Sequence, residues 1–189
     1  MATTFAQMTA DEFELLPKGG RKLELDEGVI VEVEMALAEH ELVKLKLTTL
    51  LARALPESGF EVGCEVECRL GDRVTRVPDL AIWRESDLER MDPSRTIVGG
   101  PLIAIEIVSS ESAADLDKKI RQYFTAGTQV VWVIYPKSRA IEVKRPNGSI
   151  NLDTGDVLEA PELVPGLKIH VSEIFATLNR ASASHTTPR

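Results

Sequence analysis

The sequence has few of the residues that mark several large classes of protein. Only two of its 189 residues are cysteine, Cys64 and Cys68, and no second cysteine or histidine cluster lies near them at zinc-binding spacing. This excludes a disulfide scaffold, and we expect both cysteines to be reduced residues of the core. No apolar run approaches the roughly 18 residues that a membrane-spanning helix needs. The sequence therefore predicts a protein that does not insert into a membrane.

The first 16 residues also have no basic side chain, and acids stand where a secretory signal would be apolar. We therefore expect a cytoplasmic protein. The composition, 43% apolar and 28% charged, is typical of a globular chain rather than a disordered one. The length predicts a single domain over residues 1–178, followed by a polar tail at 179–189 that we expect to be disordered.

Acidic residues outnumber basic ones, and the two kinds are distributed unevenly. The net charge of −8 disfavours a protein that coats nucleic acid with a uniformly basic surface. Residues 1–35 carry a net charge of −5, whereas residues 112–145 carry +4. This basic segment is either a surface that faces phosphate or a solvated helix and hairpin.

The N-terminal third predicts two helices and a hairpin. Thr9 and Glu12 form a capping box that begins a helix over 9–16. Alternating residues around Glu27-Gly28 predict a hairpin over 22–26 and 29–35 with one buried face. A longer amphipathic helix follows over 38–55. Its expected buried stripe consists of Leu42, Leu45, Thr49 and Ala52.

The remaining pattern alternates strands with one further helix. A strand pair is expected over 60–70 and 75–83, then a loop over 84–100 with at most one helical turn. An almost continuous apolar run at 102–108 predicts a central strand buried on both faces. Ser112 begins a helix that ends near Ala126. The later strands are expected at 130–135 and 139–144 and in short pieces up to 178. The whole order predicts an α/β fold in which a mixed central sheet is flanked by helices, with extra C-terminal strands.

Two carboxylates stand where the local pattern favours apolar residues. Asp79 lies in Val77-Pro78-Asp79-Leu80-Ala81, and Glu106 lies in the apolar run at 102–108. A buried carboxylate needs a cation or a set of donors. A shared Mg²⁺ would meet this need with hard oxygen ligands from neighbouring strands. The alternative is two unrelated carboxylates, each at a strand end or paired with an arginine such as Arg76.

The helix after Glu106 brings a basic side chain toward the same strand end. Asp115, Lys119 and Tyr123 recur every four residues and share one helix face. Lys119 can therefore reach back over the strand, where an ammonium beside a metal-bound water would suit phosphodiester hydrolysis. The alternative is a solvated lysine paired with Asp115.

Six segments carry a family resemblance that spans most of residues 9–178. They are, in chain order, Leu23-Glu24-Leu25-Asp26-Glu27-Gly28, His40, Pro78-Asp79, Glu106-Ile107-Val108-Ser109, Asp115 with Lys119 and Tyr123, and Gln129-Val130-Val131-Trp132. Each segment is weak evidence alone. In this order, however, the six segments resemble the PD-(D/E)XK nuclease superfamily and, within it, the Uma-two group of bacterial endonuclease-like proteins. The resemblance implies a restriction-endonuclease-like fold.

The resemblance also implies the chemistry and the residues that perform it. Asp79 and Glu106 would bind Mg²⁺ or Mn²⁺ with the backbone carbonyl of Ile107, and Glu24 would add a third carboxylate or a ligand of a second metal. Lys119 would orient the attacking water or the phosphate. The implied activity is hydrolysis of DNA by a metal-activated water, which leaves a 5′-phosphate and a 3′-hydroxyl.

Other readings of four of these positions stay open. Glu24 is equally compatible with the solvent side of its hairpin, and His40, a supporting residue by resemblance, with a packing or capping role. Tyr123 and Trp132 suit the core better than a surface that stacks on bases. The superfamily lysine two residues after the acid is absent, because Val108 stands there. The resemblance implies that its role has moved to Lys119, since Lys118 points about 100° away on the helix.

DNA is the expected partner, and the basic segment 112–145 would have to contact it. Arg121 and Lys144 are the candidate DNA-binding residues, and a homodimer would present two such surfaces to the two strands. The competing hypothesis is a catalytically inactive nuclease-fold protein that acts as a binding or regulatory module. The net charge of −8 and the missing lysine favour it, whereas the retained carboxylates and Lys119 favour the enzyme.

Overall fold

The computed structural model describes residues 7–33, 37–55 and 59–178. The expected tail at 179–189 lies outside these ranges, and a single domain over 1–178 stays a prediction. None of the helices within the described ranges is long and apolar enough to cross a bilayer. These helices are α1 (Ala10–Glu14), α2 (Ala38–Ala54), α3 (Glu85–Leu88), α4 (Ala113–Thr125) and α5 (Val171–Ile174).

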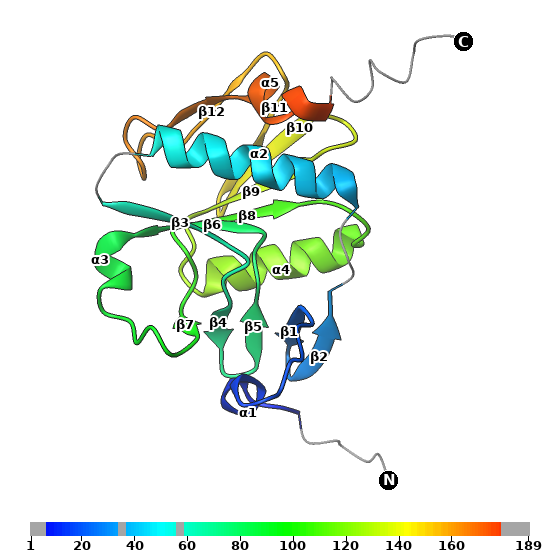
Figure 1. The fold of residues 1–189 in the computed structure, drawn as a ribbon, viewed down its shortest axis with the longest axis vertical. Helices are drawn as coiled ribbons and strands as arrows, with labels where there is room; N and C mark the ends of the chain where they lie inside the picture. The colour runs from blue at the N-terminus through cyan, green and yellow to red at the C-terminus, as the bar shows by residue number, and fades with distance from the viewer. Residues whose placement is uncertain (1–6, 34–36, 56–58, 179–189) are drawn as a thin grey trace.

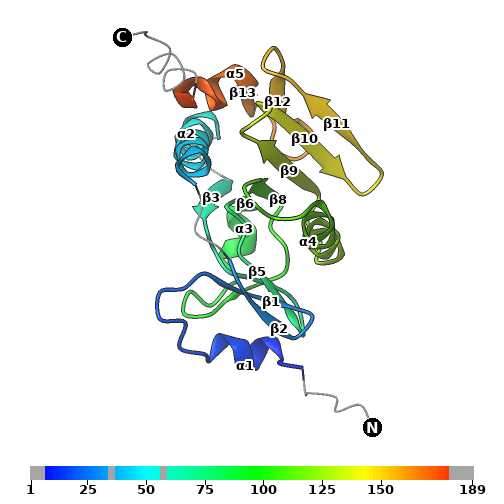
Figure 2. The same ribbon diagram turned by 90° about the vertical axis from the view of Figure 1, so that its right-hand side faces the viewer.

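A six-stranded mixed sheet runs through the centre of the molecule (Figure 1). β8 and β9 are parallel and are connected through α4, whereas β6 is antiparallel to β8. Figure 2 shows α2 and α4 on opposite sides of this sheet, so the expected mixed sheet flanked by helices is confirmed. Its strands, in spatial order, are β11 (Gly148–Leu152), β10 (Ala140–Arg145), β9 (Val130–Tyr135), β8 (Ile103–Ile107), β6 (Leu80–Arg84) and β3 (Phe60–Cys64).

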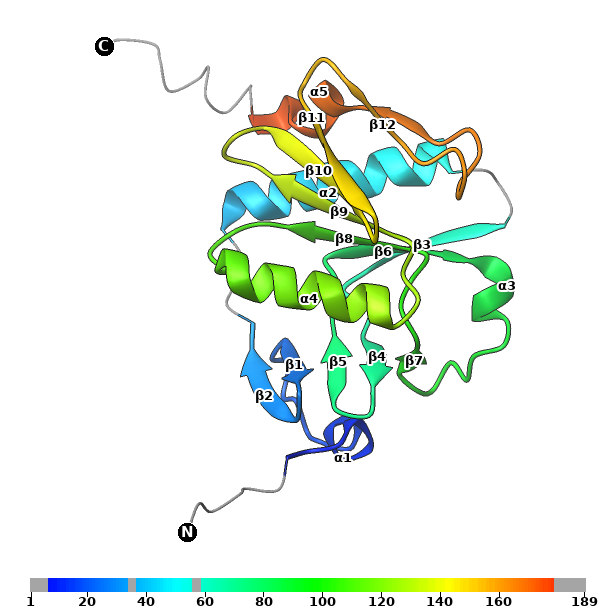
Figure 3. The same ribbon diagram turned by 180° about the vertical axis from the view of Figure 1, so that it is seen from behind.

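A smaller five-stranded sheet lies to one side of the six-stranded sheet, and α4 runs alongside the region where the two sheets meet (Figures 2 and 3). The side chains of α4 reach both sheets, because Lys119 contacts Glu106 and Lys118 contacts Asp26. A separate pair, β12 (Val157–Glu159) and β13 (Lys168–His170), belongs to the expected C-terminal strands. The strands of the smaller sheet, in spatial order, are β2 (Val29–Glu32), β1 (Leu23–Asp26), β5 (Val74–Arg76), β4 (Cys68–Gly71) and β7 (Ile97–Val98).

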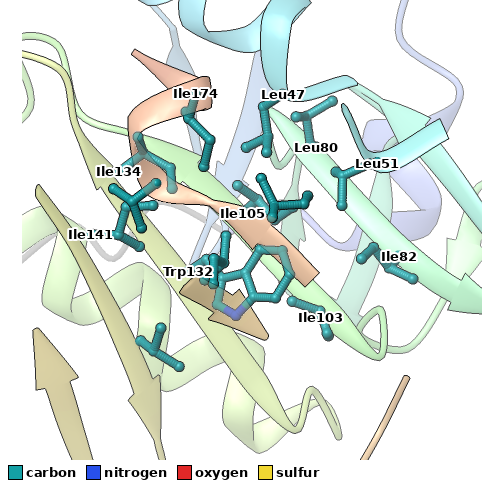
Figure 4. Packing of buried hydrophobic residues seen from close by; sticks show 14 of the residues in the cluster. Leu47, Leu51, Leu80, Ile82, Ile103, Ile105, Trp132, Ile134, Ile141 and Ile174 are labelled. Carbon is teal, nitrogen blue, oxygen red and sulfur yellow. The ribbon is translucent and has the colours of Figure 1, made fainter. Parts of the chain in front are cut away.

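Alternation along β8 divides the interior into two apolar clusters. Ile105 faces α2 and packs in one cluster with Leu47 (Figure 4). Ala104 faces the other way and packs in the second cluster with Leu116 of α4. Because side chains two apart on a strand share a face, Glu106 lies on the Ala104 side and is directed toward α4. The lone acid of the central strand therefore meets the helix that follows it.

The buried face of α2 differs from the one that the sequence predicts. The predicted stripe is wrong at Leu45, which is 67% exposed, and at Ala52, which is also exposed, whereas Leu42 packs half-buried against the core. Apolar residues occur on several sides of this helix, so spacing alone does not select the inner face. The side chains that are buried are His40, Val43, Leu47 and Leu51.

The predicted hairpin forms, but its burial differs from the expectation. Glu27 and Gly28 both have positive φ, as a tight two-residue turn requires. β1 is covered on both faces, because α1 packs on Leu23 while Glu24 is buried on the other face. All four residues of β2 are exposed, since β2 is the edge strand. The prediction of one buried face along both strands is therefore wrong.

The strand pair predicted over 60–70 and 75–83 is broken into two pairs. β3 and β6 belong to the large sheet, whereas β4 and β5 belong to the smaller one. The first predicted strand is interrupted after Cys64 and the second before Leu80. These two interruptions are adjacent in space, as shown by the 3.2 Å hydrogen bond from the Glu65 N–H to the Asp79 carbonyl. Pro78 has no N–H to donate to a strand ladder, which favours a break at this point. Asp79 thus lies where the chain crosses between sheets, immediately before β6.

The same break separates the two cysteines. Cys64 ends β3 and is exposed, whereas Cys68 begins β4 and is buried. The expectation that both lie in the core is wrong for Cys64, because the two side chains belong to different sheets and no longer share a strand face.

Candidate functional site

Glu106 is buried between the central strand and α4. Its side chain is 3% exposed, Oε1 accepts a hydrogen bond of 2.7 Å from the Tyr123 hydroxyl, and Oε2 lies 3.4 Å from Lys119 Nζ. Burial raises the pKa of Glu106 to about 7, opposed by the Lys119 charge and reinforced by Asp79 and Glu24. This carboxyl can therefore change its charge near neutral pH, unlike an ordinary surface glutamate.

Lys119 extends from α4 into a group of carboxylates. Its ammonium lies 3.7 Å from both Glu24 Oε1 and Glu111 Oε2, in addition to its contact with Glu106. Burial lowers the pKa of Lys119, but the surrounding carboxylates outweigh burial and raise it overall, so the side chain stays charged. The alternative of a solvated lysine paired with Asp115 is wrong, because the side chain is only 12% exposed and faces Glu106.

Lys118 points elsewhere, as the helix geometry predicts. Its ammonium contacts Asp26 at 2.9 Å and Glu27 at 3.4 Å, both on the β1–β2 hairpin. The two neighbouring lysines therefore contact different carboxylates, since consecutive residues of a helix are rotated by about 100°. This separation makes Lys118 a matched control for Lys119.

Asp79 is held by donors from three different segments of the chain. Its Oδ2 accepts hydrogen bonds from His40 Nε2 of α2 at 3.0 Å and from the Ile107 N–H of β8 at 2.8 Å. Its Oδ1 lies 3.2 Å from Lys22 Nζ. Burial raises the pKa of Asp79, but the His40 hydrogen bond and the Lys22 charge outweigh it and lower the pKa to about 2. Asp79 is therefore ionised at neutral pH.

Glu24 faces inward from β1. The side chain is 3% exposed and accepts 2.8 Å and 3.0 Å hydrogen bonds from Arg76 Nη1 and the Val77 N–H. The alternative that places Glu24 on the solvent side is therefore wrong. Arg76 pairs with Glu24 and with Asp26 at 2.8 Å, so the ammonium groups near Asp79 and Glu106 come from lysines instead.

The donor set suits a hard divalent cation. Asp79 and Glu106 are linked through Ile107, which directly follows Glu106 and whose N–H donates to Asp79 Oδ2. Carboxylate and carbonyl oxygens are the ligands that Mg²⁺ and Mn²⁺ favour. In the described residues no group of three or more His, Cys, Asp or Glu side chains converges as a metal cage. A divalent cation at this place would have to be held by the two carboxylates and the backbone carbonyl of Ile107.

Two charged residues of the site are missing from the sequence prediction. Lys22 contacts Asp79, and Glu111 contacts Lys119 from the loop between β8 and α4. Lys22 stands two residues before Glu24, so the strand period of two was a signal for a shared face. Glu111 lies in an irregular serine-rich segment, where no periodicity predicts the direction of a side chain.

Among the described residues, neither of the residues expected to contact DNA pairs with Asp79, Glu106 or Lys119. Arg121 is exposed on α4. Lys144 on β10 is half-buried and lies 3.5 Å from Asp117 and 3.3 Å from Glu142. The charge of Lys144 is thus partly balanced within the protein, and a role for either residue in binding DNA stays a prediction.

Comparisons with known proteins agree with this fold. A protein structure described as a "putative nuclease belonging to DUF820", from Anabaena variabilis ATCC 29413, superposes with a TM-score of 0.80. It is 24% identical, with 90% of this chain and 99% of that chain covered, and at this identity the likeness shows the fold. No curated protein sequence matches. The model of the Uma2 family, described as "Putative restriction endonuclease", matches residues 10–172. That match covers most of the chain, which therefore belongs to the Uma2 family.

Proposed function

We propose that this protein is a Mg²⁺- or Mn²⁺-dependent DNA endonuclease. The observation that carries the proposal is the convergence on Glu106: the side chain faces Lys119 and Tyr123 from one helix, and its neighbour Ile107 binds Asp79. Three segments of the chain thus contribute two carboxylates and an ammonium near the end of a buried strand. The Uma2 match supports a nuclease over other hydrolases with similar groups.

Asp79 and Glu106 are the residues that would hold the metal ion. The Ile107 backbone carbonyl would be a third ligand, and Glu24 is the further candidate. A divalent cation bound there lowers the pKa of a coordinated water and so supplies the nucleophile for phosphodiester hydrolysis. The chain contributes the orientation of Asp79, because His40 and the Ile107 N–H fix its Oδ2.

Lys119 would act on the phosphate or on the attacking water. Its charge is retained inside the site because carboxylates surround it, and a fixed ammonium stabilises negative charge that develops on phosphate oxygens. Tyr123 holds Glu106 from the same helix face. Hydrolysis in this arrangement would leave a 5′-phosphate and a 3′-hydroxyl, as the family resemblance implies.

DNA would approach along α4, and the active form would be a homodimer. Arg121 is exposed on that helix, and two copies would present two sites to the two DNA strands. Because the chain is acidic overall, binding would depend on such a local surface rather than on net charge.

Calorimetric titration with Mn²⁺ tests the metal site. The wild type should bind Mn²⁺, and Asp79→Asn should not, because the substitution removes a charged ligand. Circular dichroism of both proteins controls for folding. Equal Mn²⁺ affinity in the two proteins would contradict the proposed ligands.

One observation favours the competing hypothesis of an inactive scaffold that acts as a binding or regulatory module. Each carboxylate of the site already has a protein cation beside it: Arg76 at Glu24, Lys22 at Asp79 and Lys119 at Glu106. Such pairs are also what a purely structural buried network requires. Absence of both Mn²⁺ binding and cleavage in the wild type would select this hypothesis.

A further inference from the structure

Lys22 is a second lysine of the site and comes from outside α4. It directly precedes β1, and its ammonium lies 3.2 Å from Asp79 Oδ1 and 3.3 Å from Glu65 Oε1. Its side chain is 24% exposed. The partly exposed ammonium thus contacts Oδ1 of the buried carboxylate, whereas His40 contacts Oδ2.

The hydrogen bonds of Asp79 leave one of its oxygens for a cation. Oδ2 accepts from both His40 Nε2 and the Ile107 N–H, and a carboxylate oxygen has about two lone-pair positions. Oδ1 has Lys22 as its partner. A metal ion that binds Asp79 in this conformation must therefore approach Oδ1, where the ammonium already lies.

We infer that Lys22 competes with the divalent cation for Asp79 Oδ1 and so sets the metal affinity of the site. This inference rests on the proposed metal-dependent function. Two positive groups cannot share one carboxylate oxygen without strong repulsion. Metal binding therefore has to displace the ammonium from Oδ1, and Glu65 offers it an alternative partner at 3.3 Å.

Lys44 provides a matched control. Its ammonium contacts the same Glu65 Oε1 at 3.0 Å, and it also contacts Glu41 at 2.8 Å. It is also largely covered, with 14% of its side chain exposed. Replacing either lysine by methionine removes one positive charge beside Glu65 and keeps an apolar stem, but only Lys22 is bonded to Asp79 in the described residues.

The expected effect is a tighter site without Lys22. A charge within about 5 Å of a divalent cation changes the affinity about tenfold even at the dielectric constant of water. Lys22→Met should therefore bind Mn²⁺ about tenfold more tightly than the wild type. Lys44→Met should change the affinity by less than about twofold, because among the described residues the Lys44 ammonium pairs with Glu41 and Glu65 and not with Asp79.

The test is a calorimetric Mn²⁺ titration of the full chain as wild type, Lys22→Met, Lys44→Met and Asp79→Asn. Tightening in Lys22→Met alone supports the inference. An unchanged or weaker affinity in Lys22→Met, with binding in the wild type and none in Asp79→Asn, overturns the inference and leaves the metal site standing. Absence of binding in both the wild type and Lys22→Met overturns both proposals. Lys22→Gln replaces Lys22→Met if circular dichroism shows that the latter does not fold.

Discussion

The Tyr123 hydroxyl donates a 2.7 Å hydrogen bond to Glu106 Oε1 inside the protein. Tyr123 is fully buried, and Glu106 is 2% exposed, so water does not replace this bond when it is lost. Tyr123 lies one helical turn after Lys119, which contacts the other oxygen of the same carboxylate. One face of α4 therefore determines both the position and the electrostatic environment of Glu106.

Removing this hydroxyl should destabilise the protein. Tyr123→Phe leaves a buried carboxylate oxygen without its donor, at an expected cost of about 1–3 kcal/mol in the free energy of unfolding. Tyr135→Phe is the control, because the Tyr135 hydroxyl is 3.4 Å from Glu142 and the residue is only half-buried. Urea unfolding of both variants measures the difference. Equal losses of unfolding free energy in the two variants would show that the hydrogen bond to Glu106 stabilises the protein no more than the half-buried one of Tyr135 does.

Glu106 should also make stability depend on pH in the absence of metal. Its pKa is raised from an ordinary 4.5 to about 7 by burial first, and by Asp79 and Glu24. Its stabilising contribution is therefore complete below about pH 4.5 and is lost as the pH rises through 7. Glu106→Gln does not titrate, so its stability relative to the wild type should increase by about 2 kcal/mol between pH 5 and pH 8.

Urea unfolding in buffer with a chelator, at intervals from pH 5 to pH 8, measures this change. Glu106→Asp controls for the loss of packing, because it shortens the side chain but keeps a titrating carboxyl. A constant difference between Glu106→Gln and the wild type across the range would mean that Glu106 keeps one protonation state in the folded protein.

The fold could be predicted largely because its strongest local signals agree with the packing. The apolar run of β8 predicts a central strand, and Glu106 is conspicuous as its single acid. Ser112 caps α4 where the sequence predicts it, and its side chain accepts from the Asp115 N–H. These features depend on residues that are close in the sequence, so local spacing is sufficient.

The errors occur where the outcome depends on distant segments. The inner face of α2 is chosen by the strands beneath it, and the leucines on its other sides make Leu45 and Leu47 indistinguishable from spacing alone. The partners of Asp79 depend on where the chain crosses between the two sheets. The contact of Asp79 with His40, 39 residues earlier, therefore requires the tertiary structure.

Lys119 should be essential for cleavage, and Lys118 should not be. Lys119→Ala removes the ammonium beside Glu106 and should lower the cleavage rate about 10²-fold or more, the usual scale for a positioned charge in an active site. Mn²⁺ binding should be retained or tightened, because an ammonium is not a metal ligand. Lys118→Ala removes only a contact with the hairpin, so its rate should be close to that of the wild type.

Cleavage of supercoiled DNA at saturating Mg²⁺ compares these two variants. Lys119→Arg should also be poor, because a planar guanidinium does not replace a compact ammonium. Equal cleavage rates for the two alanine variants would contradict a role of Lys119 in the reaction.

DNA affinity should fall steeply with salt. An acidic chain can bind phosphates only through a local basic surface, and each contact releases counterions. Arg121→Glu should weaken binding to all DNA sequences alike. Lys144→Glu should weaken it less, because Asp117 and Glu142 already balance part of that charge. Fluorescence anisotropy between about 50 and 200 mM salt measures the slope, and a flat slope would contradict a phosphate contact.

Nicking of a supercoiled plasmid in Mg²⁺, by the wild type and by Glu106→Gln side by side, tests the central claim most directly. The two proteins differ by one charge at the centre of the site, and Gln can still accept the Tyr123 hydrogen bond, so the fold is preserved. The account predicts Mg²⁺-dependent nicking by the wild type, abolished by a chelator, and none by Glu106→Gln. Equal nicking by both proteins would contradict it.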